Sequence, residues 1–200
     1  MSLPTISSGR SNYNGLYMVE EKWKTIDSEY LVRSRYMTVR RDRVQLPDGR
    51  VNPEYYVLEF PQWVNVIALT REGKMVMVRQ YRHGLGDFQT EIVAGYVDPG
   101  DDTLLAAAQR ELLEETGFGG GEWEEFATLS ANPANHNNIT HTFLACEVEQ
   151  IAHQSLDSTE DLKPLLMSED EVLALLQNGE IKQALMAAVL WKYFYEKDRG

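Results

Sequence analysis

The sequence predicts an α/β protein in which a mixed sheet has helices on both sides and a smaller antiparallel β unit precedes it. Three observations lead to this prediction. Short β-branched runs, such as residues 64–69 and 75–79, are typical of buried strands. Residues 103–116 are rich in Ala, Leu and Glu, which favour a helix. Two further helical segments, 168–177 and 181–195, follow the last predicted strand at 140–148.

The chain divides into two predicted parts, residues 1–60 and residues 61–200. The first 15 residues have the composition of a flexible tail rather than that of a signal peptide. In the β unit that follows, strands over 30–44 and 55–60 flank a hairpin turn at 46–50. Three strands alone are only marginally stable, so the unit must pack on the main domain or on a partner chain. Its aromatic side chains either pack there or stack on a nucleotide base; they are Trp23, Tyr30, Tyr36, Tyr55 and Tyr56.

An acidic cluster lies in the middle of the predicted helix 103–116. Residues three and four apart share a helix face, so Glu111, Glu114 and Glu115 lie close together. Hard divalent ions such as Mg²⁺ prefer carboxylate oxygens and also bind phosphates, which makes these glutamates candidate metal ligands. The alternative is a solvated acidic face on which Arg110 pairs with Glu114. Before the helix, residues 95–100 carry turn signals, and Asp101 or Asp102 is expected to form the N-cap.

Composition narrows the classes of function. The chain has 31 acidic and 19 basic residues, a net charge of −12, which disfavours binding to nucleic acid. No apolar run approaches the roughly 20 residues of a membrane span. Cys146 is the only cysteine, so no internal disulfide can form. The cytoplasm is the expected location.

Residues 95–118 resemble the Nudix box, written G-x5-E-x7-R-E-U-x-E-E-x-G-U with U a bulky apolar residue. The sequence departs from it at the first acidic position. Counting back from Arg110 places Asp102 there, while counting forward from Gly95 places Asp101 there and puts an extra residue after it. The matching residues are Gly95, Arg110, Glu111, Leu112, Glu114, Glu115, Gly117 and Phe118.

Outside the box, residues 23–195 resemble the ADP-ribose pyrophosphatase branch of the Nudix family, which includes nucleoside-diphosphate-sugar hydrolases. Residues 79–82 are similar to its QYR segment. Residues 91–95 are similar to its E-x-P-A-G segment, with Val93 in place of proline. Residues 130–134 stand where many members have a Ser-Pro-Gly loop, and residues 156–160 resemble its acidic loop.

This resemblance implies a Nudix α/β/α sandwich and a set of roles. The side chains of Glu111, Glu114 and Glu115 and the carbonyl of Ala94 would hold Mg²⁺ or Mn²⁺. Glu160 would take a proton from the attacking water, with Asp157 as the second candidate. Arg110 would anchor the helix through a carboxylate. Arg82 and Glu91 would contact the ribose–phosphate part of the substrate. Apart from the resemblance, Arg79, at a strand end before the metal site, either contacts phosphate or ribose or is a surface arginine.

The implied reaction is hydrolysis of the diphosphate bond of ADP-ribose or a related nucleoside-diphosphate sugar, which gives a nucleoside monophosphate and a sugar phosphate. The N-terminal β unit resembles the element through which this branch forms domain-swapped homodimers. Two alternatives stay open. The substrate could be a dinucleoside polyphosphate, NADH, GDP-mannose or capped RNA, or the domain could be a non-catalytic sensor of nucleotide sugars.

Overall fold

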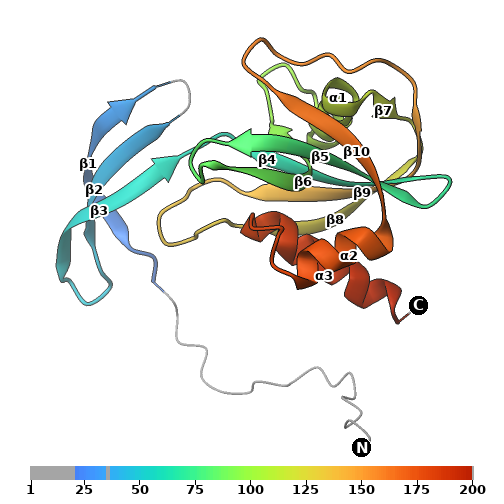
Figure 1. Cartoon of the computed structure of the whole chain (residues 1–200). Coiled ribbons are helices and arrows are strands. Elements are labelled where there is room, and N and C mark those ends of the chain that lie inside the picture. The colour runs from blue at the N-terminus through green and yellow to red at the C-terminus, as the bar shows by residue number, and fades with distance from the viewer. Residues whose placement is uncertain (1–20, 35–36, 200) are drawn as a thin grey trace, which may run out of the picture.

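The computed structural model describes residues 21–34 and 37–199, and the predicted tail and Tyr36 lie outside these ranges. It contains two sheets (Figure 1). The smaller one is antiparallel and has the order β1-β2-β3, with β1 at Lys24–Arg33, β2 at Thr38–Gln45 and β3 at Val51–Glu59. The hairpin turn predicted at 46–50 joins β2 to β3, and the predicted N-terminal antiparallel unit is therefore confirmed.

The larger sheet is mixed and has the order β10-β5-β6-β4-β9-β7, with β8 paired to β9. Only the pairing of β4 with β9 is parallel among its described strand pairs. The strand bounds are β4 Trp63–Thr70, β5 Lys74–Arg82, β6 Asp87–Tyr96, β7 Phe118–Gly119, β8 Glu122–Leu129, β9 Thr140–Gln150 and β10 Leu162–Ser168.

Helices cover both faces of this sheet, as the sequence predicts. Helix α1 (Leu104–Thr116) packs on one face through Ala107, Ala108 and Leu112, against the valines of β4, β5 and β6. Helices α2 (Glu169–Gln177) and α3 (Ala184–Lys197) pack on the other face, over Ile67, Met77 and Ile92 among others. Helix α2 begins with the predicted capping box of Ser168 and Glu171, whereas α3 begins three residues later than expected, at a Gln183 N-cap.

The small sheet is joined to the large one through a loop that the sequence marks only as polar, residues 130–139. Leu58 of β3 donates its N–H to the carbonyl of Asn135 (2.7 Å) and accepts one from Asn137 (3.2 Å). Phe60 N–H donates to the Asn137 side chain at 3.2 Å. The asparagines thus supply backbone partners to the end of β3, so the two sheets are tied at this point. None of the described helices is long and apolar enough to cross a membrane.

Candidate active site

The acidic helix is placed by the strand and loop before it. Strand β6 is buried from Gln89 to Gly95, and the chain then turns into α1. The N-cap is Thr103, whose hydroxyl oxygen accepts a hydrogen bond from Ala106 N–H at 3.0 Å. The prediction that Asp101 or Asp102 caps this helix is therefore wrong. The physical reason is that both carboxylate oxygens of Asp101 accept hydrogen bonds from an arginine, whereas Thr103 directly precedes the first residue of the helix.

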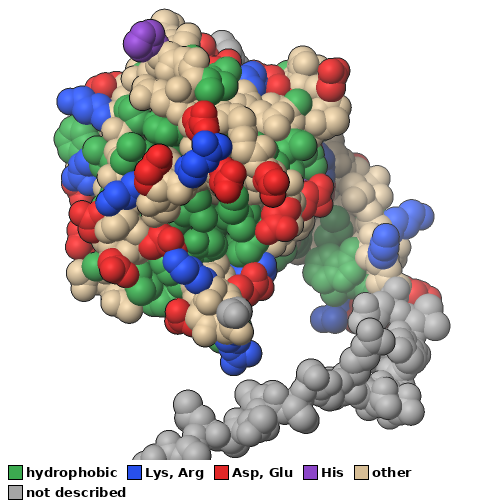
Figure 2. Space-filling view, turned by 90° about the vertical axis from the view of Figure 1, so that its right-hand side faces the viewer, with side chains coloured by type: hydrophobic (Ala, Val, Ile, Leu, Met, Phe, Trp, Pro, Cys, Tyr) green, Lys and Arg blue, Asp and Glu red, His purple; other side chains and the backbone are tan. Residues whose placement is uncertain are grey.

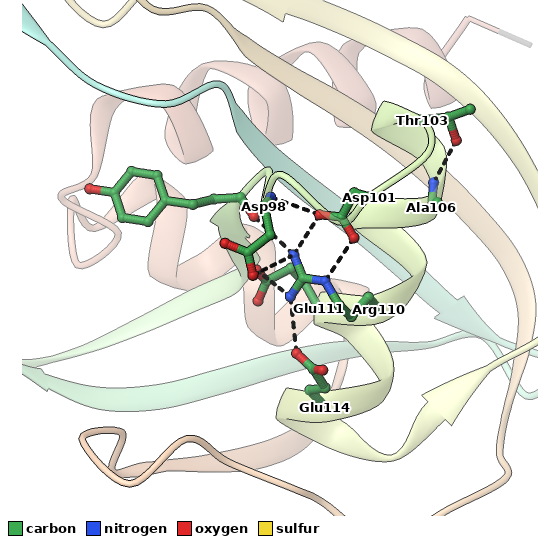
Figure 3. A network of polar contacts seen from close by, with 8 residues as sticks. Asp98, Asp101, Thr103, Ala106, Arg110, Glu111 and Glu114 are labelled. Atoms are coloured by element: carbon green, nitrogen blue, oxygen red, sulfur yellow. Dashed lines mark hydrogen bonds and ion pairs between the residues drawn. The ribbon is translucent and has the colours of Figure 1, made fainter. Parts of the chain in front are cut away.

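That arginine is Arg110, whose guanidinium is fixed from several sides (Figure 3). Its Nε and Nη2 donate to the two carboxylate oxygens of Asp101 at 3.0 and 2.9 Å, and Nη2 also donates to the Tyr96 carbonyl at 3.0 Å. Hydrogen bonding from Arg110 lowers the pKa of Asp101. Asp101, rather than Asp102, thus takes the acidic position of the motif, and the extra residue follows it. Arg110 anchors α1 to the preceding loop through a carboxylate, as expected.

The three glutamates differ in their surroundings. Arg110 Nη1 donates to Glu111 Oε1 and to Glu114 Oε2, both at 3.0 Å, so the predicted Arg110–Glu114 pair is present. A solvated acidic face does not describe the rest of the cluster, because Glu111 and Glu115 are buried. The side chain of Glu114 is 45% exposed and lies at the rim.

Burial makes the two inner carboxylates hard to ionise. It raises the pKa of Glu111 to about 7, with Arg110 acting in the opposite direction and Glu114 and Glu160 adding to the rise. Burial likewise raises the pKa of Glu115 to about 8, reinforced by the charges of Glu111 and Glu160. Two such groups side by side are stabilised as anions only if a positive charge approaches them.

Two details of the site bear on its fit to a divalent cation. Glu115 Oε2 is buried and accepts no hydrogen bond. A Cβ on Gly95 would lie 2.1 Å from the Glu111 carboxyl carbon, so the glycine lets this carboxylate lie directly against the strand backbone. The pKa of Glu115 is influenced by the Ala94 backbone, which places that residue beside it. An oxygen-rich cluster with an unpartnered oxygen fits a hard cation.

The glutamates are not yet arranged as a complete ligand set. Within residues 21–34 and 37–199, no three His, Cys, Asp or Glu side chains are positioned to hold a metal ion as they stand. The ion pairs explain this, because Arg110 holds Glu111 and Glu114. Two of the three carboxylates are therefore turned toward Arg110.

The buried Glu91 pairs with the partly exposed Arg82 next to this cluster. Arg82 Nη2 and Nε donate to Glu91 Oε2 at 2.6 and 2.9 Å, and Gln80 Nε2 donates to the same oxygen at 3.1 Å. The charge of Arg82 reaches Glu115 and opposes the rise in its pKa. The sequence did not single out Gln80, although its position two residues before Arg82 on a strand places both on one face.

Arg79 lies elsewhere. It is one residue out of phase with Gln80 and Arg82 on β5, and its Nη1 donates to Thr90 Oγ1 at 2.8 Å. It lines a hollow of about 400 Å³ that is also lined by Leu175, Asn178 and Lys182 from the side of α2 and α3. The structure therefore separates Arg79 from Arg82 by the thickness of the sheet, and does not bring it to the glutamates.

Glu160 approaches the cluster from the loop between β9 and β10. Its charge adds to the raised pKa of both Glu111 and Glu115. Asp157 lies next to it, and its backbone N–H donates to Glu160 Oε2 at 3.0 Å. The loop thus presents the carboxylate of Glu160, partly held by Asp157, to the same side of α1.

Two family models together match most of the chain. The NUDIX domain family matches residues 60–189, and the family described as nucleoside diphosphate sugar hydrolase N-terminal domain matches residues 23–58. The chain is 30% identical over 165 residues to the ADP-ribose pyrophosphatase of Bacillus subtilis, covering 82% of this chain and 88% of the relative. It is 32% identical over 159 residues to the methanol dehydrogenase activator of Bacillus methanolicus, covering 79% and 85%.

The fold also matches that of a solved structure. A crystal structure of an ADP compounds hydrolase superposes with a TM-score of 0.76 at 22% identity, covering 90% of this chain and 97% of that one. Together with the acidic helix, its anchoring arginine and the sheet that carries them, the family match over residues 60–189 shows that the chain belongs to the Nudix family of hydrolases, and it is similar within that family to the ADP-ribose pyrophosphatases.

Proposed function

We propose that the protein hydrolyses the diphosphate bond of ADP-ribose or a related nucleoside-diphosphate sugar and releases a nucleoside monophosphate and a sugar phosphate. The observation that carries this proposal is the buried pair Glu111 and Glu115, beside the Arg82–Glu91 pair. Burial raises the pKa of both Glu111 and Glu115, and a bound cation would stabilise their ionised forms. The match of residues 23–58 to the N-terminal domain of nucleoside diphosphate sugar hydrolases supports the substrate class.

The metal ligands in this proposal are Glu111, Glu114 and Glu115 with the carbonyl of Ala94, and the ion is Mg²⁺ or Mn²⁺. When bound, such an ion neutralises the negative charge of the diphosphate and lowers the pKa of water. The chain itself sets the ligand geometry. Asp101 fixes Arg110, and Gly95 lets Glu111 reach the strand.

The remaining roles belong to side chains around the cluster. Glu160 accepts the proton of the water whose oxygen attacks phosphorus, while the bond from phosphorus to the bridging oxygen breaks and the leaving phosphate departs with that oxygen. Arg82 and Glu91 contact the ribose–phosphate part. Arg79, on the other face of the sheet, contacts substrate only if a distant portion of it reaches the hollow near Asn178.

We further propose that residues 61–200 form the hydrolase domain and that the β unit of residues 1–60 joins two copies as a homodimer. All ten residues of β1 are exposed. Large apolar side chains of the unit are exposed as well: Trp23, Ile26, Tyr30, Leu31, Val32, Met37, Val51 and Tyr56. A three-stranded sheet with this much apolar surface is stabilised by being covered. Sedimentation of the wild type and Leu31→Asp tests it: loss of dimer in the variant supports the proposal, and a monomeric wild type refutes it.

The surface charge favours a small-molecule substrate over nucleic acid. On the face shown in Figure 2, Lys and Arg lie among Asp and Glu instead of forming one continuous basic patch. The net charge of −12 repels a long polyanion.

The test is turnover of a substrate panel with Mg²⁺ or Mn²⁺, using ADP-ribose, ADP-glucose, GDP-mannose, NADH, diadenosine polyphosphate and capped RNA. Release of AMP from ADP-ribose that a chelator abolishes, and that Glu115→Gln reduces strongly, is the expected result. Turnover of NADH, diadenosine polyphosphate or capped RNA alone would keep the chemistry and reject the substrate class. Binding of ADP-ribose without turnover, with either metal, would indicate a sensor.

A further inference from the structure

The loop that carries Glu160, residues 151–161, is tied at its beginning to the end of the acidic helix. Ser155 N–H donates to the Glu114 carbonyl at 2.8 Å, and the N–H groups of Ile151 and Ala152 donate to the Gly117 carbonyl at 2.9 and 3.0 Å. The last carbonyls of a helix lack partners within the helix, so they are available for such bonds. The backbone of the residues that form the acidic face therefore also anchors the loop.

One side chain joins this beginning of the loop to its end. Gln154 Nε2 donates to the carbonyl of Glu115 at 2.6 Å and to the carbonyl of Leu162 at 3.2 Å. Glu115 belongs to α1, and Leu162 is the first residue of β10, two residues after Glu160. A single amide nitrogen thus holds the two ends of the loop together and holds both against the helix.

The segment between these ends needs such a tie. Glu160 stands between Ser155 and Leu162, both of which are tied to the end of α1, and its negative charge is repelled by those of Glu111 and Glu115. Leu156 packs on the core under α1, and a turn closes between Asp157 and Glu160 through a 3.0 Å bond from Glu160 N–H to the Asp157 carbonyl. These contacts shape the tip of the loop, whereas Gln154 fixes where that tip stands relative to the helix.

We propose that Gln154 is a positioning residue, whose amide holds Leu162 at the end of α1 and thereby keeps Glu160 over the acidic helix face. The proposal rests on the proposed function in one respect, the role of Glu160 as the base. Gln154 does not touch the glutamate side chains that bind metal, so its loss should lower kcat while leaving KM and the dependence of the rate on Mg²⁺ concentration unchanged.

The experiment compares Gln154→Met, which keeps the length of the side chain without its donor, with Gln150→Met as a matched control at an exposed position of β9. We expect kcat for ADP-ribose to fall roughly 10- to 100-fold in Gln154→Met, a part of the about 10²–10⁴-fold that a general base supplies. Gln154→Lys, which restores a donor at similar reach, should recover most of the rate. Gln150→Met should behave as the wild type.

A double variant shows whether Gln154 acts through Glu160. In a Glu160→Gln background, Gln154→Met should cause no further loss of kcat, because the group it positions is already gone. Equal additional loss in both backgrounds would overturn the proposal. A wild-type rate in Glu160→Gln would overturn it too, since there would be no base to position.

A second measurement does not depend on turnover, so failure of the proposed function can be told apart from failure of this inference. Amide hydrogen exchange of residues 155–161 should become faster in Gln154→Met, while α1 and β10 keep the exchange rates of the wild type. Unchanged exchange in the loop would overturn the positioning role even if the enzyme proves active. Faster exchange in the loop alone would support it even if the substrate lies outside the panel.

Discussion

Replacing Glu115 with glutamine should stabilise the metal-free protein at alkaline pH. The side chain is buried, and one of its oxygens accepts no hydrogen bond. Burial raises the pKa of this carboxyl from 4.5 to about 8. The folded state therefore binds the proton more tightly than the unfolded state does, and the free energy of unfolding falls as pH rises from the unfolded value through the folded one.

The size of the effect follows from the two pKa values. For a group that ionises near 4.5 when unfolded and near 8 when folded, the linkage cost is about 4 kcal/mol at about pH 8 and about 1 kcal/mol or less at about pH 5. Glu111 shares part of this cost, because the two charges raise each other's pKa. The free energy of unfolding of Glu115→Gln, relative to that of the wild type, should therefore be higher at about pH 8 than at about pH 5 by on the order of 1–3 kcal/mol.

Urea unfolding in the presence of a chelator, followed at both pH values, measures this difference. The control is Glu125→Gln, which removes an exposed carboxylate on β8 and should follow the wild type at both pH values. With excess Mg²⁺ the order should reverse, because the metal stabilises only a protein that keeps the carboxylate. A variant that is less stable than the wild type by the same amount at both pH values would refute the reasoning.

Three further predictions concern single contacts. Gly95→Ala places a Cβ 2.1 Å from the Glu111 carboxyl. The value of kcat/KM should therefore fall roughly a hundredfold, while the circular dichroism spectrum stays unchanged. A wild-type rate would show that Glu111 need not lie against the strand. Arg82→Met leaves the buried Glu91 without its charge partner and should cost about 3–5 kcal/mol in urea unfolding, with partial recovery in the double variant that also carries Glu91→Gln. In Gly117→Ala the new Cβ would lie 2.3 Å from the Ala152 carbonyl oxygen, at a φ of 78°. The free energy of unfolding should fall by about 1–3 kcal/mol more than in Gly120→Ala, where φ is 71° but no atom lies within 4 Å. Equal losses in the two variants would contradict the close contact.

The elements around the acidic helix were predictable because local signals and burial agree there. Residues 103–116 favour a helix by composition, the β-branched strands mark the core, and the capping box at Ser168 predicts the start of α2. The N-cap of α1 was not predictable from propensity alone. Asp101 is a good capping residue, but its carboxylate is bound by Arg110, nine residues away, and a tertiary contact of this kind leaves no local pattern.

The site was predictable where one motif contains it and less so where distant segments meet. Arg79 and Arg82 look equivalent in the sequence, yet strand alternation sends them to opposite faces of the sheet. The pairing of residues 135–137 with the end of β3 depends on a contact between segments about 77 residues apart. Gln154 acts through backbone carbonyls that have no sequence signature.

Arg110 gives the acidic face an internal counterion. Where ligand carboxylates have no such partner, their repulsion couples folding to metal uptake. Here one guanidinium contacts Glu111 and Glu114 and offsets part of their negative charge, while Asp101 and the Tyr96 carbonyl hold it from the other side. The chain can therefore fold first and acquire its proposed metal afterwards by exchanging one cation for another. Under that order of events, removal of the ion abolishes activity without unfolding the protein. Activity then depends on the free divalent ion concentration, while the amount of folded protein stays constant.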